Sequence, residues 1–177
     1  MLEVKNVNSK LNEYEKILQI YKESFPENEK IPVWLLKIMA KRTSVDFLAF
    51  YDENIFCGFT YLIYNKNTTF VFYLAIDKNI RSKGYGSKIL NWIIENNKEN
   101  CIVLNIETVD TKYNNYEQRL SRQKFYLKNG FVDSKYKIID KYEIYDVLYK
   151  GSNFSKSEYE ELFKKFSFGF VRKKLSI

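Results

Sequence analysis

The chain has 177 residues, of which 45% are hydrophobic and 18% aromatic, and its formal charge at pH 7 is +7. This length and composition fit one globular domain with a substantial core and exclude an intrinsically disordered chain. The sequence contains no histidine, which excludes a Ser-His-Asp or Cys-His nucleophile and any metal site that depends on histidine. Proton transfer must therefore use Glu, Asp, Tyr, Lys or water.

No apolar run follows the amino-terminal residues MLEVKNVNSK, and the longest apolar run, FVFYLAI, is too short to span a bilayer. These features predict a cytoplasmic protein without a membrane partner. Cys57 and Cys101 lie in apolar stretches and are expected to be buried thiols. The positive charge is spread among acidic residues along the chain, which favours a solvated surface over nucleic-acid binding.

The first half of the chain predicts two helices followed by three strands. Apolar residues recur at helical spacing from Leu11 to Phe25, where Pro26 ends the pattern, and a second helix is expected over 33–41. The next stretches are rich in β-branched and aromatic residues and are separated by the polar turns DEN and NKN, which predicts an antiparallel meander. These stretches are 46–51, 54–65 and 68–76.

From residue 77 onward the pattern predicts a βαβ unit. The polar loop DKNIRSKGYG leads into a helix over 86–97, and the continuous apolar run CIVLNI at 101–106 is typical of a strand buried on both faces. A strand, a helix and a strand over this length predict a parallel pair with a right-handed crossover.

A further helix is expected from Asn114, because Asn114 and Glu117 have the spacing of a capping box. Gly130 fits the left-handed position just after its end. Two strands to about Tyr149, a break at 151–153, a helix over 155–166 and a basic tail complete the chain. These elements predict an α/β fold: a mixed, mostly antiparallel central sheet with a βαβ unit and helices on both faces. The expected organisation is a domain over 1–150, with the helix and tail of 151–177 packed on it.

The segment RSKGYG, from Arg81 to Gly86, contains two of the six glycines and two cations. It does not match the dinucleotide pattern, because Ile89 replaces the third glycine, and it lacks the earlier glycine of a P-loop. It does lie where a strand passes into the first turn of a helix, whose amide groups have no intrahelical partner. Such a turn can hold a phosphate, but these residues alone do not distinguish that role from a simple strand-to-helix turn.

At this loop the sequence resembles the GNAT superfamily of N-acetyltransferases. YLAIDKNIRSKGYGSKIL is similar to the motif in which a strand ends in R/Q-x-x-G-x-G/A and a helix receives the pyrophosphate of acetyl-CoA; Arg81, Gly84 and Gly86 occupy that pattern. FYLKNGF at 125–131 resembles the second signature, a helix ending in Tyr and then Gly-Phe. The order of elements agrees over residues 1 to 150. The resemblance implies acetyl-CoA as co-substrate, no metal, and a loop that holds the diphosphate.

The resemblance also implies where the cofactor and the leaving group lie. Main-chain groups of the strand before the loop would contact the pantetheine arm and the thioester carbonyl. Tyr126 would protonate the CoA sulfur; the alternative is a packed helix aromatic. The residues expected to bind acetyl-CoA are Leu74, Ala75, Ile76, Arg81, Ser82, Lys83, Gly84, Tyr85, Gly86 and Ser87.

Glu107 is the first candidate for the base that takes the amine proton through water, because it ends a strand beside the crevice where parallel strands diverge. The alternative for Glu107 is an ion pair with Arg119 or Arg122. Many family members have Asn and Ala at the positions of these two arginines, so Arg122 is expected to orient Glu107 or to bind an anionic group of the substrate. Glu29, in FPENEK, either faces the amine or is a solvated loop carboxylate.

The resemblance therefore implies an N-acetyltransferase that moves an acetyl group from acetyl-CoA to a primary amine by direct attack in a ternary complex. A non-catalytic acetyl-CoA-binding sensor or scaffold is the alternative, because it needs the loop but neither Tyr126 nor Glu107. The acceptor is expected to be a small-molecule or peptide amine, with no nucleic acid as partner, and the protein a monomer or a homodimer.

Overall fold

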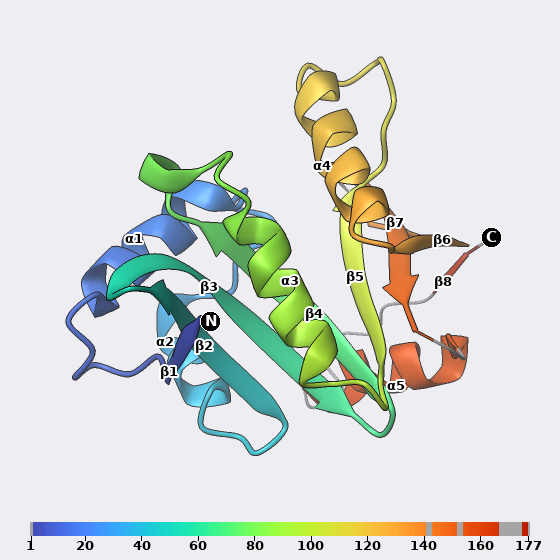
Figure 1. Ribbon diagram of the computed structural model, residues 1–177. Coiled ribbons are helices and arrows are strands. Elements are labelled where there is room, and N and C mark those ends of the chain that lie inside the picture. The colour runs from blue at the N-terminus through green and yellow to red at the C-terminus, as the bar shows by residue number, and fades with distance from the viewer. Residues whose placement is uncertain (1, 141–142, 152–153, 167–174, 177) are drawn as a thin grey trace. The chain divides into compact units, whose positions relative to one another are not determined.

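The computed structural model describes residues 2–140, 143–151, 154–166 and 175–176 (Figure 1). The chain divides into two compact units that alternate along the sequence. The first unit comprises Met1–Ile63 and Val71–Glu95, and the second comprises Tyr64–Phe70 and Asn96–Ile177. None of the helices in the described part has the length and apolar character needed to cross a lipid bilayer.

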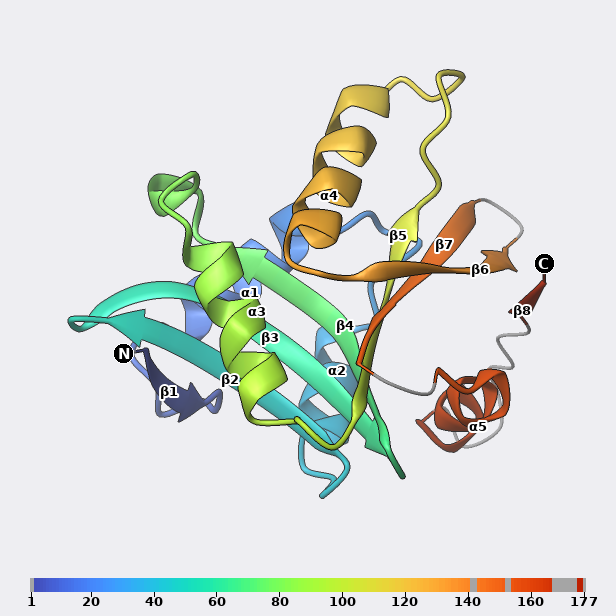
Figure 2. The same cartoon turned by 45° about the vertical axis from the view of Figure 1, so that its right-hand side comes forward.

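The first unit contains a sheet with helices on both of its faces. Strand β1 pairs antiparallel with β2, and β2 pairs antiparallel with β3. Helix α3 lies across one face of β2 and β3, while α1 and α2 lie on the other (Figures 1 and 2). Its elements are β1 (Glu3–Asn6), α1 (Tyr14–Ser24), α2 (Val33–Met39), β2 (Val45–Asp52), β3 (Ile55–Asn65), β4 (Thr68–Ile76), the 3₁₀ turn η1 (Lys78–Ile80) and α3 (Tyr85–Glu95), with the ends of β3 and β4 around 64–70 belonging to the second unit.

The second unit is built around β5. The start of β4 pairs parallel with β5, β5 pairs antiparallel with β7, and β6 pairs antiparallel with both β7 and β8. Over the whole chain the strand order is β1-β2-β3-β4-β5-β7-β6-β8. The sheet is therefore mostly antiparallel with one parallel pair, as the sequence predicted. The elements are β5 (Cys101–Glu107), α4 (Tyr116–Lys128), β6 (Val132–Ile139), β7 (Ile144–Lys150), α5 (Lys156–Phe166) and β8 (Leu175–Ser176).

Aromatic side chains form much of the core of the first unit. The stripe predicted for α1 is buried at Tyr14, Leu18 and Tyr21, and Ile17 is buried beside it. Tyr21 packs edge-on against Tyr73 of β4, with ring centroids 4.9 Å apart. On the opposite face of the sheet, Trp92 of α3 packs edge-on against Phe50 of β2 at 5.3 Å. Edge-to-face rings of this kind add to the stabilisation from burial alone.

Two tyrosine hydroxyls fix the backbone between α1 and α2, and a third binds α2 itself. Tyr73 donates to the carbonyl oxygen of Glu29 at 2.7 Å, and Tyr21 donates to that of Ile31 at 2.8 Å. Tyr61 donates to the carbonyl oxygen of Leu36, in α2, at 3.1 Å. Because buried backbone carbonyls need a hydrogen-bond partner, these tyrosines satisfy a connection that has no regular structure of its own.

Helix α5 packs within the second unit through an aromatic cluster. Its Tyr159 and Phe163 are buried and contact Phe70, at the start of β4. The hydroxyl of Tyr159 also donates to Oδ1 of Asn105 in β5, at 2.9 Å. The carboxy-terminal helix thus contributes side chains to the core of this unit.

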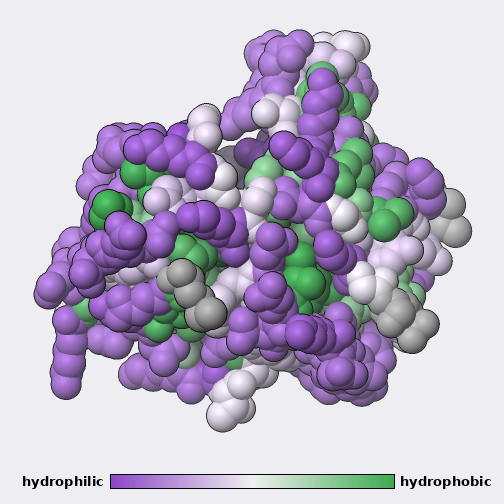
Figure 3. All heavy atoms as spheres, in the orientation of Figure 1, coloured by the Kyte–Doolittle hydropathy of each residue, from purple (hydrophilic) through white to green (hydrophobic). Residues whose placement is uncertain are grey.

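The surface is largely polar on the face shown in Figure 3, where hydrophobic areas are small and separate. Trp34 and Ile38, one turn apart on α2, are the largest exposed apolar pair on one helix within the described residues, at 63% and 54% exposure. Single exposed apolar side chains are normal on soluble folds.

The predicted long elements are confirmed, with ends that move by a few residues, and Gly130 has the predicted left-handed φ of 82°. The capping box was wrong: α4 begins at Tyr116 after Asn115, which makes no side-chain capping bond. Its amide instead binds Glu107 and Arg119, so a tertiary contact replaces the local one. The short elements β1, η1 and β8 were not predicted. The break at 152–153 and the basic cluster at 172–174 lie outside the described residues.

Candidate active site

The glycine loop joins β4 to α3 in the first unit, as the sequence predicted. After Ile76 the chain forms the single turn η1, passes through Arg81 to Gly84, and enters α3 at Tyr85. Ser82 and Gly84 both have positive φ angles, 64° and 81°. Lys83 between them has negative φ, and turn backbone of this kind can direct N–H groups toward one point and form an anion-binding concavity. Only Gly84 of the two glycines uses its left-handed freedom, since Gly86 lies inside the first turn of α3.

The amide groups of this loop are unpaired. Within the described residues, no backbone N–H from Arg81 to Ser87 donates to a backbone carbonyl, and the first such bond of the helix runs from Lys88 N to Gly84 O at 3.1 Å. Helix α3 has 11 residues, so its dipole adds positive potential at this end. Unpaired amides at a helix amino terminus are a ready site for a phosphate.

The cations around the loop differ in their partners. Lys88 is engaged by Asp52 of β2, with Nζ and Oδ2 3.0 Å apart, and its ammonium lies over the ring of Tyr85. Arg81 and Lys83 are exposed and have no acidic partner in the part of the chain that the structure describes. The loop therefore carries two uncompensated positive charges beside its unpaired amides.

Asp77 holds the start of the loop. It is only 3% exposed, it accepts the N–H of Asn79 at 3.0 Å as the cap of η1, and it forms an ion pair with Lys16 of α1. A second, longer ion pair of opposite polarity joins Lys78 to Glu23 of α1. Burial acts to raise the pKa of Asp77, but Lys16 and the Asn79 N–H outweigh it and the pKa is lowered. The carboxylate is thus ionised at neutral pH and fixes η1 to α1.

The end of β4 approaches β3 closely at Gly58. A Cβ at this position would lie 2.3 Å from the carbonyl oxygen of Ala75, a distance that side chains do not tolerate. Ala75 is buried, whereas its neighbours Leu74 and Ile76 are half-buried. The absence of a side chain at Gly58 therefore allows the close approach of Ala75, whose backbone is predicted to contact the thioester.

Glu29 lies in the connection between α1 and α2, in the first unit. Its side chain is half-buried, and its main-chain carbonyl accepts the Tyr73 hydroxyl described above. The structure therefore places it in a segment tied to β4 at the residue before Leu74.

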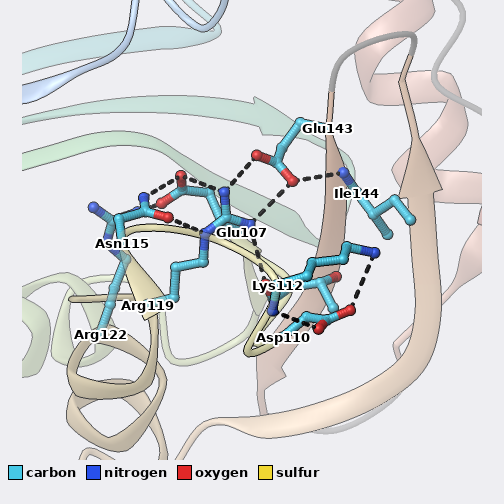
Figure 4. Close-up of polar contacts among 9 residues, drawn as sticks. Glu107, Asp110, Lys112, Asn115, Arg119, Arg122, Glu143 and Ile144 are labelled. Carbon is cyan, nitrogen blue, oxygen red and sulfur yellow. Dashed lines mark hydrogen bonds and ion pairs between the residues drawn. The ribbon is translucent and has the colours of Figure 1, made fainter. Parts of the chain in front are cut away.

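In the second unit, Glu107 lies at the centre of a buried polar cluster (Figure 4). Its Oε1 accepts from Asn115 Nδ2 at 3.2 Å and lies 3.4 Å from Arg119 Nη2, and its Oε2 accepts from Arg122 Nη1. The side chain is 8% exposed. The ion pairs that the sequence offered as an alternative role for Glu107 are thus both present.

The two arginines of α4 differ in how fully they are bonded. Arg119 is 4% exposed; its guanidinium binds Glu143 at 3.0 and 2.6 Å and also reaches the Thr108 carbonyl and Asn115 Oδ1. The hydrogen bonds from Arg119 hold the pKa of Glu143 below its usual value. Arg122 is 33% exposed, and the bond to Glu107 is its only hydrogen bond among the described residues. Arg119 is therefore a saturated structural cation, while Arg122 keeps unused donors.

Tyr126 follows Arg122 by one turn of α4. Its ring packs against Phe125 and Phe131, with centroids 5.1 and 5.6 Å apart. Desolvation raises the pKa of the hydroxyl to about 12, and the nearby charge of Arg122 acts in the opposite direction. No hydrogen bond from this hydroxyl occurs within the described residues. The group is a neutral donor at physiological pH.

The sequence prediction covers two groups of residues, one in each unit: the β4–α3 loop in the first, and Glu107, Arg122 and Tyr126 in the second. It missed the supporting residues Asp77 and Glu143. The pattern Asp-x-Asn directly after a predicted strand could have indicated the cap at Asp77. The partner of Glu143 depends on tertiary structure, and no local signal identifies it.

The strand–turn–helix unit thus combines amides and two cations that have no partner among the described residues, an arrangement that can accept a phosphate. The chain belongs to the GNAT family of acetyltransferases: the family model described as "Acetyltransferase (GNAT) domain" matches residues 43–133, which are 91 of the 177 residues. The resemblance stated from the sequence is thereby confirmed. No protein with curated annotation shows significant similarity to the chain.

Solved structures share the fold. A GNAT-family protein from Bacteroides thetaiotaomicron aligns with a TM-score of 0.77 at 20% identity, over 96% of this chain and 99% of its own. Ard1 from Thermoplasma volcanium aligns with a TM-score of 0.64 at 18% identity, over 84% of this chain and 96% of its own. An aminoglycoside 6'-N-acetyltransferase in complex with coenzyme A has the same TM-score and coverages at 13% identity.

Proposed function

We propose that this protein transfers the acetyl group of acetyl-CoA to a primary amine by direct attack within a ternary complex. The observation that carries the proposal is the β4–α3 loop, where, among the residues that the structure describes, the amides from Arg81 to Ser87 have no backbone acceptor and two cations have no acidic partner. Membership of the GNAT family and the coenzyme A complex of one structural neighbour support acetyl-CoA as the ligand.

In this proposal the loop binds the diphosphate of acetyl-CoA. The amides and the α3 dipole supply fixed partial charges, and Arg81 and Lys83 supply full ones. The main-chain groups of Leu74, Ala75 and Ile76 bind the pantetheine arm and the thioester carbonyl. The remaining members of the binding set are Ser82, Gly84, Tyr85, Gly86 and Ser87.

Tyr126 is proposed as the acid that protonates the departing sulfur. Two features support this role: a pKa of about 12 keeps the hydroxyl protonated, and within the described residues the hydroxyl has no other hydrogen-bond acceptor. A neutral donor without a competing partner is suited to a leaving group that develops negative charge.

Glu107 is proposed as the group that accepts the amine proton through a water molecule. Protonation of Glu107 itself would weaken its ion pairs with Arg119 and Arg122. We therefore propose that the carboxylate orients the water and passes the proton on rather than storing it. In this proposal Glu29 faces the acceptor amine, which belongs to a small molecule or a peptide, and Arg122 orients Glu107 or binds an anionic group of the acceptor.

The proposal is tested by mixing the purified protein with acetyl-CoA and a panel of primary amines that includes polyamines, aminoglycosides and peptides with free amino termini. Release of CoA thiol is the readout, and at least one amine should raise it well above slow hydrolysis. Tight CoA binding with no amine-dependent thiol release would instead support a sensor or scaffold.

Gly84 provides a matched pair of variants for the loop. Its φ is positive, and an added Cβ would meet no atom within 4 Å; Asn and Asp are the residues that tolerate this conformation best. Gly84→Asn and Gly84→Asp then differ mainly by one negative charge. We expect Gly84→Asp to lose at least tenfold more CoA affinity than Gly84→Asn in calorimetry. Equal affinities would contradict a phosphate site in this loop.

A further inference from the structure

Resting on the proposed function, we infer that Arg122 is a further catalytic residue, whose guanidinium holds the departing CoA sulfur as a thiolate until Tyr126 protonates it. In this step the amine nitrogen forms the new C–N bond and the C–S bond breaks. The electron pair of that bond goes to sulfur, and the amine loses one proton to water. The Tyr126 hydroxyl then gives its proton to sulfur and regains one from solvent.

The position of Arg122 on α4 supports this role. Residues four apart on a helix share a face, and helix side chains lean toward the amino terminus, so the ring of Tyr126 lies over the turn that carries Arg122. The charge of Arg122 acts to lower the pKa of the Tyr126 hydroxyl, against the effect of desolvation. The positive potential of Arg122 therefore reaches the atom that is proposed to meet the sulfur.

The bonding of the cluster leaves Arg122 available. The charged cluster around it comprises Glu107 from β5, to which it is bonded, and Arg119 from α4, which is bonded in turn to Glu143 just before β7; together the four side chains have no net charge (Figure 4). Glu143 forms a bidentate ion pair with Arg119, while Glu107 binds both arginines and Asn115. Arg122 is thus only partly compensated, and Glu107 fixes one of its nitrogens in place.

The guanidinium also has donors for an anion. It carries five N–H groups, and one hydrogen bond is its complete set among the described residues. Its side chain is 33% exposed, against 4% for Arg119 one turn earlier. A guanidinium with one nitrogen bonded to a carboxylate and other N–H groups exposed can stabilise a thiolate, as cations beside reactive cysteines do.

The test is the acidity of the CoA thiol in the binary complex, which needs no acceptor amine. The complex with CoA is treated with iodoacetamide over a range of pH, and formation of alkylated CoA is followed by mass, so that Cys57 and Cys101 do not interfere. We expect the wild-type complex to lower the pKa of the CoA thiol below that of free CoA. Arg122→Gln, which keeps a donor for Glu107, should reduce alkylation at pH 7 by about tenfold, and Arg122→Lys should retain most of it.

Lys124→Met is the matched control, because it removes one exposed cation from the same helix at a position that does not share the face of Tyr126. It should leave the thiol pKa unchanged. An equal thiol pKa in wild type and Arg122→Gln would overturn the inference, and so would an equal effect of Lys124→Met. Failure of wild-type protein to bind CoA in calorimetry would overturn the proposed function instead, so the two failures are distinguishable. If Arg122→Gln does not fold, Arg122→Met takes its place, because it also removes the positive charge; it should lose the shift that Arg122→Lys and Lys124→Met both retain.

Discussion

Glu107 meets two guanidinium groups and one amide, and this environment decides how its proposed role as base can be tested. Glu107→Gln keeps the shape of the side chain and removes its charge. If Glu107 assists proton removal, kcat should fall about a hundredfold while CoA affinity stays within about twofold. Activity should partly recover at high pH, where the amine deprotonates without help. Steady-state rates from pH 6 to 10, with calorimetry for CoA, measure both effects.

Glu143→Gln is the control for this variant, because Glu143 has the same partner, Arg119, but no proposed chemistry. Equal losses of activity and stability in both variants would show that the cluster acts through its ion pairs alone. Full activity of Glu107→Gln at neutral pH would move the base elsewhere, with Glu29 as the next carboxylate to test.

Single residues differ in how well the sequence identified them. The position of Gly84 and Arg81 in a strand-to-helix turn could be predicted because it depends on neighbours within a few positions, a strand before and a helix after. The pairing of Arg119 with Glu143 could not, because 24 positions separate them and the contact depends on how β7 meets α4. Asn115 was also missed, because the sequence offered Asn114 as a local cap for α4. The Asn115 side chain instead binds Glu107 of β5 and Arg119 one turn further along α4.

At the scale of elements, α1 is tied to the turn that precedes the phosphate loop. Loss of the Asp77 cap in Asp77→Ala should cost roughly 1–2 kcal/mol of stability, as loss of a side-chain cap does. If CoA requires η1 in its present conformation, the same variant should bind CoA about fivefold to thirtyfold more weakly. Thermal unfolding and calorimetry on the folded variant measure the two quantities.

Lys78→Met serves as the comparison for Asp77→Ala. Its ion pair with Glu23 has a 3.5 Å separation and both side chains are largely exposed, so its loss should change stability by less than about 0.5 kcal/mol. Unchanged CoA affinity in Asp77→Ala would show that the loop forms without its cap.

The long elements were predictable because hydrophobic period and turn residues agree over eight or more positions. The short ones were not. Strand β1 has four residues and β8 has two, and each exists because a neighbouring strand offers an edge to pair with. An element of that length contains too few positions to show a period.

At the scale of the whole molecule, buried tyrosines predict unfolding by alkali. Burial raises the pKa of Tyr21, Tyr51, Tyr61, Tyr73 and Tyr159, and that of Tyr126 to about 12. A raised folded pKa means that the folded state binds more protons than the unfolded state above pH 10, so stability is complete below about pH 10 and falls as the pH rises further. Each such group lowers the free energy of unfolding by up to about 1.4 kcal/mol per pH unit, whereas the whole free energy of unfolding of a globular protein is roughly 5–15 kcal/mol.

We therefore expect the fold to be lost between about pH 10 and 12, with the tyrosinate absorbance of the buried groups appearing in one cooperative step. The chain has 15 tyrosines. In denaturant, all of them should titrate together. Gradual ionisation of all 15 around pH 10, with circular dichroism unchanged, would contradict the burial of these hydroxyls.

The alternation of the two units along the sequence has a consequence for the chain as it leaves the ribosome. The first unit has all its residues once Glu95 has been added, but Thr68–Phe70 must wait for Cys101–Val103 before the parallel pair can form. At about 5–20 residues per second, the nascent chain exposes that side of β4 for roughly 2–7 seconds, far longer than the microseconds in which a hairpin closes. Translation speed between codons 70 and 103 thus sets how long an unpaired strand edge is available to chaperones or to a neighbouring nascent chain.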